Sequence, residues 1–97
     1  MISLPIRVED ADGSAELVFE VVEENERRIC WLYHLELHLK LPPKAWLRKV
    51  RGELAKLENI AREAGCAEMR IRGRDWSKII IGFEALDGVP NGLRKVL

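Results

Sequence analysis

Cysteine and aromatic residues are scarce in this sequence, and several common targeting signals are missing. The 97 residues include two cysteines, and aromatic side chains make up 6% of the chain. Cys30 and Cys66 are too few for a disulfide framework and lack metal-site spacing, so we expect reduced, buried thiols. No apolar run approaches the roughly 18 residues that a membrane span needs. The first ten residues mix Pro5 with charges, unlike a signal peptide, which favours a cytoplasmic protein.

The formal net charge is zero, although the charges are unevenly distributed along the chain. Residues 1–39 hold nine acids and three bases, whereas residues 40–78 hold eleven bases and five acids. Such asymmetry is compatible with a phosphate or polyanion site. It is equally compatible with two halves of one domain that attract each other, because many of the bases have acids at helical spacing. The hydrophobic share of 47% is typical of a single globular domain.

The hydrophobic pattern predicts an α+β fold, with a mostly antiparallel, mixed sheet, one long helix and one short helix. The predicted elements are an N-terminal edge strand and turn (1–14), a hairpin (15–40), the long helix (43–64), a strand (67–73), the short helix (75–81) and a last strand with a tail (83–97). In the second hairpin strand, strict alternation places Tyr33, Leu35 and Leu37 on one face. His34, Glu36 and His38 then lie on the opposite face.

Proline and glycine mark the ends of the long helix. Pro43 suits the first helical turn, where the missing N–H costs nothing. Gly65 is expected to end the helix in the left-handed conformation. Gly52 lies inside the helix at a cost of about 1 kcal/mol against alanine, which suggests a close packing contact.

Three short segments resemble the GNAT family of N-acetyltransferases. Residues 61–66, Ala-Arg-Glu-Ala-Gly-Cys, resemble a helix end that leads into a strand in this family. Residues 80–84 are similar to its "L-G-F-E" segment, and residues 73–76 to a "G-R-x-G-W" passage of a GNAT-like group that is associated with bacteriophages and prophages. The resemblance covers residues 29–86 and implies a truncated GNAT-like domain over residues 1–97.

The resemblance also implies where acetyl-CoA would bind. The family holds the pyrophosphate in a glycine-containing loop before the long helix, where free N–H groups and the helix dipole favour phosphate. The corresponding residues 45–50 contain no glycine, and Pro42 and Pro43 remove two donors. Lys44, Arg48 and Lys49 are the candidate cofactor-binding residues, acting by charge.

The candidate catalytic residue is also implied by the resemblance. GNAT enzymes often place a general-base glutamate on the strand before the long helix, and Glu36 is at a matching position. Many of them have a tyrosine as general acid four residues before the glycine of "L-G-F", where this chain has Lys78.

Two functions follow from these features. The first is a phage or prophage protein that acts by binding a protein partner, without catalysis or cofactor, as a virion component or a modulator of a host protein. The second is a minimal acetyl-CoA-dependent N-acetyltransferase. In both cases exposed strand edges make a homodimer plausible.

Two further clusters suggest weaker alternatives. His34, Glu36 and His38 combine two imidazoles and a carboxylate, ligands that zinc and iron accept, but two strand steps separate the histidines and no metal site is expected. Arg70, Arg72 and Arg74 could neutralise phosphates. No aromatic platform is expected to interleave with them, so nucleic acid is not an expected partner.

Overall fold

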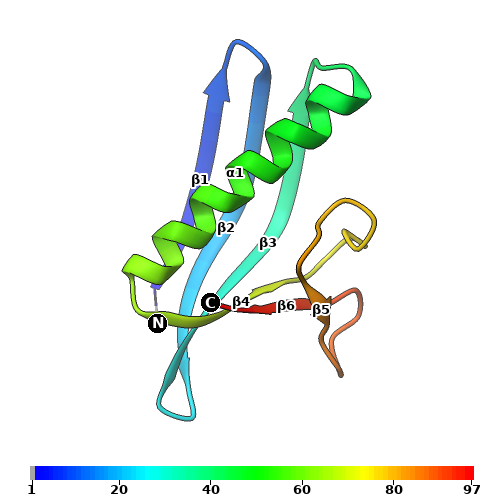
Figure 1. The fold of residues 1–97 in the computed structure, drawn as a ribbon. Coiled ribbons are helices and arrows are strands. Elements are labelled where there is room, and N and C mark those ends of the chain that lie inside the picture. Colours follow the sequence, from blue (N-terminus) through cyan, green and yellow to red (C-terminus); the bar gives the residue numbers. More distant parts are fainter. Residues whose placement is uncertain (1) are drawn as a thin grey trace.

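The computed structural model describes residues 2–97 as one six-stranded sheet with a long helix across one face (Figure 1). The elements are β1 (Ile2–Asp10), β2 (Gly13–Glu24), β3 (Arg27–Leu39), α1 (Pro43–Glu63), β4 (Cys66–Ile71), β5 (Glu84–Ala85) and β6 (Leu93–Val96). The predicted α+β class and mixed sheet are therefore confirmed. Among the described residues, no helix combines the length and apolar composition that crossing a membrane requires.

The strands lie in the order β1-β2-β3-β4-β6-β5. β3 and β4 are parallel, and α1 connects them; the other neighbouring pairs are antiparallel. A parallel pair needs a crossover of this length, whereas antiparallel neighbours need only turns. We call the sheet face that α1 covers the helix face and the opposite one the open face.

A bulge in β3 changes which side chains face the helix. Glu16 pairs with Glu36 but Val18 pairs with Tyr33, so β3 has one extra residue between the two pairs. His34 adopts a left-handed φ of 53° at this point. One extra residue moves every later side chain to the other face. The prediction of one continuous apolar face is therefore wrong.

Below the bulge, the helix face carries Cys30 and Leu32, both fully buried. Beyond it, Leu35, Leu37 and Leu39 face the helix instead, and all three line the space beneath α1. Tyr33, predicted to share their face, lies on the open face.

The long helix begins at the predicted residue, and the glycine expected after its end has the left-handed conformation. It begins at Pro43 and is followed by Gly65 with a φ of 80°, whose N–H donates to the Arg62 carbonyl oxygen. The inference about Gly52 is wrong: a Cβ added there would meet nothing within 4 Å. This position faces solvent and not a packing partner.

The predicted short helix over residues 75–81 does not form. Residues 77–79 make a turn, in which the N–H groups of Ile79 and Ile80 both donate to the Trp76 carbonyl oxygen. Three successive β-branched isoleucines oppose helix formation, and one turn alone does not compensate for helix nucleation. Trp76 and Ile80 nevertheless reach the core.

The core lies at one end of the molecule, between β4 and the C-terminal half of α1. Met69 and Ile71 of β4 and Ala61 of α1 are completely buried there. Glu58 of α1 forms an ion pair with Lys95 of β6 at 2.8 Å and fixes the same half of the helix. α1 runs obliquely across β1–β3, with its N-terminal end beside the end of β3 and its C-terminal end on the side of β1 (Figure 1).

Candidate functional site

An apolar pocket of about 230 Å³ lies beneath the middle of α1, where its lining from the helix extends over residues 49–60. The sheet contributes Ile6, Leu17 and Leu37 to its walls, and α1 contributes Val50, Leu54 and Leu57. Trp76 and Ile80 border it on the side of the core. Interiors of proteins are normally packed with few voids larger than a water molecule. Apolar space of this size can take an apolar group, since an engineered cavity of about 150 Å³ binds benzene.

The bulge and the helix axis together create this pocket. The extra residue in β3 directs Leu35, Leu37 and Leu39, which follow the bulge, toward α1. α1 itself approaches β4 more closely than it approaches any other strand. The leucines therefore face a part of the helix that is not in close contact with the sheet.

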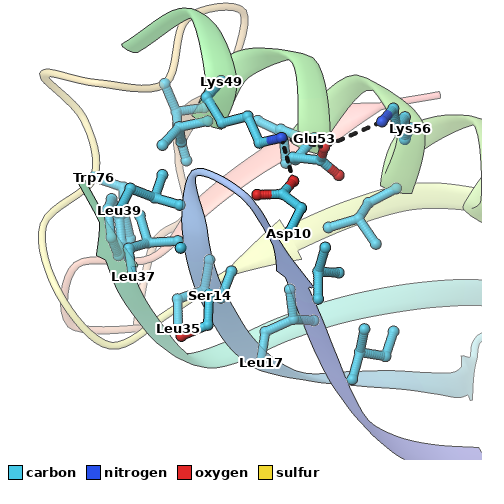
Figure 2. A pocket seen from close by; sticks show the side chains of 18 of the residues that line it. Asp10, Ser14, Leu17, Leu35, Leu37, Leu39, Lys49, Glu53, Lys56 and Trp76 are labelled. Atoms are coloured by element: carbon cyan, nitrogen blue, oxygen red, sulfur yellow. Dashed lines mark hydrogen bonds and ion pairs between the residues drawn. The ribbon is translucent and has the colours of Figure 1, made fainter. Parts of the chain in front are cut away.

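Charged side chains stand at the mouth of the pocket, where Asp10 reaches up between Lys49 and Glu53 (Figure 2). The Lys49 Nζ lies 2.6 Å from Asp10 Oδ2, 3.4 Å from Asp12 Oδ2 and 3.8 Å from Glu53 Oε1. Its hydrogen bond to Asp10 lowers the pKa of that carboxyl, and the same bond raises the pKa of Lys49. The rim is thus a set of ion pairs, with Lys56 joined to Glu53 at 3.1 Å.

The three predicted cofactor-binding residues lie on the first two turns of α1, but their surroundings differ. Lys44 and Arg48 are exposed, one helical turn apart. Lys49 points to the pocket rim, where three carboxylates surround its amine. The helix starts at the cap residue Pro42, which makes no side-chain hydrogen bond. These residues do not form a phosphate cradle of backbone N–H groups.

The predicted catalytic Glu36 lies on the open face, so the sheet separates it from the apolar pocket. Its side chain is exposed, and its carboxylate is 3.7 Å from His38 Nε2. His34, at the bulge, lines the same hollow of the open face as Glu36. Within residues 2–97, no three His, Cys, Asp or Glu side chains lie close enough together to hold a metal ion.

Across the open face, β3 and β4 bring aromatic and arginine side chains together. Trp31 is the register neighbour of Arg70. The Arg70 guanidinium carbon lies 5.4 Å from the Trp31 ring centroid, and that of Arg72 lies 5.3 Å from Trp31 and 4.2 Å from Tyr33. The prediction that no aromatic residue interleaves with these arginines is therefore wrong. The residues are about forty positions apart in the sequence, and only the crossover pairs them.

A buried carboxylate limits what this open face can bind. Glu68 accepts hydrogen bonds from Arg70 and Arg94, and Arg27 approaches it at 3.5 Å. Arg70 also contacts Glu24 at 3.2 Å. Most arginines here are already neutralised by carboxylates, so the face lacks the free positive charge that nucleic acid requires.

No family model matches the chain, and no curated protein and no solved structure shows significant similarity to it. The structure is that of an α+β protein with a mixed sheet and an apolar pocket beneath its crossover helix.

Proposed function

We propose that the chain is a GNAT-like protein of phage or prophage origin that acts by binding a protein partner, as a virion component or a modulator of a host protein. The GNAT-like part of the proposal is supported by topology. α1 joins two parallel strands in a sheet whose other described pairs are antiparallel, in the strand–helix–strand order that the resemblance implies.

The observation that carries the binding role is the apolar pocket. Its walls are hydrocarbon, and the charged groups at its mouth are engaged with one another. A pocket of this composition gains free energy by taking in apolar surface, and offers no obvious acid–base pair for chemistry. Its occupant in this proposal is one large apolar side chain of a partner protein.

The rim specifies what should flank that side chain. Three carboxylates, Asp10, Asp12 and Glu53, face two amines, Lys49 and Lys56, so the mouth has an excess of one negative charge. A basic residue next to the inserted apolar side chain would complement it.

A pocket-filling variant tests this role. Ala15 lines the pocket from β2, and Ala15→Leu would fill part of the space without adding charge. Ala55→Leu is the matched control, because Ala55 is exposed on the other side of α1. We expect a partner retained from host-cell extract by the parent protein and by Ala55→Leu to be lost with Ala15→Leu. Equal retention by all three, at equal thermal stability, would contradict a role for the pocket.

The alternative is a minimal acetyl-CoA-dependent N-acetyltransferase, which the parallel β3–β4 pair and Glu36 favour. Calorimetric titration with acetyl-CoA separates the two. Micromolar binding that disappears in a Lys44→Glu, Arg48→Glu variant would overturn the non-catalytic proposal. Lys49 is left unchanged, since reversing its charge would break the rim ion pairs and confuse folding with binding. The partner could also be a second copy of the chain. Light scattering tests this, because a homodimer has twice the molar mass of the single chain.

A further inference from the structure

A second, more polar pocket lies where β3 and β4 separate. The pairing of the two strands ends at Leu32 and Ile71, and a last hydrogen bond runs from the Arg72 N–H to the Leu32 carbonyl oxygen at 3.2 Å. Beyond it, residues 33–34, 72–73 and 88–90 surround an open space of about 450 Å³. Asn91 Nδ2 donates to the Gly73 carbonyl oxygen at 3.1 Å and holds the two loops of this pocket together.

Arg72 is the distinctive residue of this pocket. Arg7, Arg27, Arg70 and Arg94, the other arginines of the open face, each form an ion pair with a carboxylate. Within residues 2–97, no carboxylate lies at ion-pair distance from the Arg72 guanidinium. The positive charge at the pocket wall is therefore available to a ligand.

The Arg72 guanidinium is also held in place. It stacks on the Tyr33 ring at 4.2 Å, and the Tyr33 hydroxyl donates to Glu20 Oε2 at 2.7 Å, which fixes the ring. Stacking leaves the N–H groups at the edge of the guanidinium plane free to donate. A side chain ordered before binding loses less conformational entropy when the ligand arrives.

The neighbouring groups add further donors. The His34 ring lies edge-on to Tyr33 with 5.0 Å between the centroids. Gly73 and Gly88 have φ angles of 113° and 80°, and within residues 2–97 neither of their N–H groups donates to a backbone carbonyl. Such unused N–H groups beside an arginine favour a tetrahedral oxyanion. Val89 and Pro90 form an apolar wall on the other side.

We propose that this pocket binds a phosphate monoester, with Arg72 holding the phosphate and the Val89–Pro90 wall contacting the organic group. Arginine donates two parallel hydrogen bonds to a phosphate, which a lysine cannot do. The space exceeds what a single inorganic ion fills, which is why an ester is expected. The inference stands on Arg72 and this pocket alone and does not depend on the function proposed above.

The test is a titration of the ¹⁵N-labelled full chain with phenyl phosphate and, separately, with inorganic phosphate. We expect saturable shifts at Arg72, Gly73 and Gly88, and tighter binding of phenyl phosphate. Arg72→Gln should weaken binding by about tenfold or more, since a charge-assisted hydrogen bond pair is lost. Arg72→Lys should also weaken binding, because lysine keeps the positive charge but cannot donate two parallel hydrogen bonds to the phosphate.

Arg74→Gln is the matched control, since it removes one exposed positive charge two residues away. This variant should bind phenyl phosphate like the parent. An equal loss in Arg72→Gln and Arg74→Gln, shifts located outside the pocket, or no saturation up to tens of millimolar would each overturn the proposal. So would equal affinity for the inorganic ion, because the apolar wall would then contribute nothing.

Discussion

Glu68 is a carboxylate with 1% of its surface exposed, and its protonation state is coupled to folding. Burial alone would raise its pKa, but the hydrogen bonds and charges of Arg70 and Arg94 outweigh burial and place the pKa below its ordinary value of 4.5. A lowered pKa stabilises the folded state above the unfolded pKa. This stability is lost as the pH falls below about 4.5 and through the folded-state pKa.

We predict that Glu68→Gln lowers the free energy of unfolding at neutral pH by about 2–4 kcal/mol, because Arg70 and Arg94 lose their buried counter-charge and keep only the more exposed Glu24 and Glu84. Its stability should also vary less than that of the parent protein below pH 4.5. Glu63→Gln, at an exposed position, is the control and should leave stability unchanged. Urea denaturation at several pH values measures both effects; parallel pH profiles for parent and Glu68→Gln would contradict the role assigned to Arg70 and Arg94.

The two cysteine thiols are predicted to be unreactive in the folded protein. Burial, with a smaller effect of the neighbouring Cys66, raises the pKa of Cys30 to about 12. Burial also raises the pKa of Cys66, although Arg28 opposes the shift. Since the thiolate is the reactive form, a thiol reagent at pH 8 should modify neither cysteine until denaturant is added. Fast labelling of the native protein would show that this part of the core opens readily.

At the level of elements, two glycines should respond in opposite directions to alanine. Gly13, at the β1–β2 turn, has a φ of 130°, and a Cβ there would lie 2.1 Å from the His38 carbonyl oxygen. Gly13→Ala is expected to destabilise the protein by about 2 kcal/mol or more, because strained backbone must move. Gly52→Ala adds a methyl group into solvent on α1 and should stabilise by about 1 kcal/mol. Thermal denaturation compares the pair; equal signs would contradict the close approach at Gly13.

The features that could be predicted are those that residues close in the sequence determine. Pro43 and Gly65 mark the helix in the sequence, and both act as expected in the structure. The bulge at His34 has no such marker, because the left-handed conformation of one histidine is selected by the pairing of β2, β3 and β4. Without the bulge, Tyr33 and the leucines after it were predicted to share one face, whereas the structure places them on opposite faces. The apolar pocket and the arginine–aromatic cluster were hidden for the same reason.

For the whole molecule, the unequal support of α1 predicts unequal dynamics. Its C-terminal half includes Ala61, which is completely buried, and Glu58, which is tied to Lys95. Its N-terminal half has no fully buried side chain; it packs Trp46 against the core and is also held by the Lys49 ion pairs and by a hydrogen bond from Arg51 Nε to the Ile79 carbonyl oxygen at 3.0 Å. Segments with few buried apolar contacts open more easily than the core.

Hydrogen exchange should therefore be faster for amides 47–52 than for amides 57–62, by about tenfold or more. Ala15→Leu fills part of the pocket under the middle of the helix, so it should slow exchange at amides 47–52, where exchange is fast in the parent, more than at amides 57–62. Ala55→Leu adds the same atoms on the exposed side and should change neither half. Uniform exchange along α1 in the parent protein would contradict the unequal support inferred for its two halves.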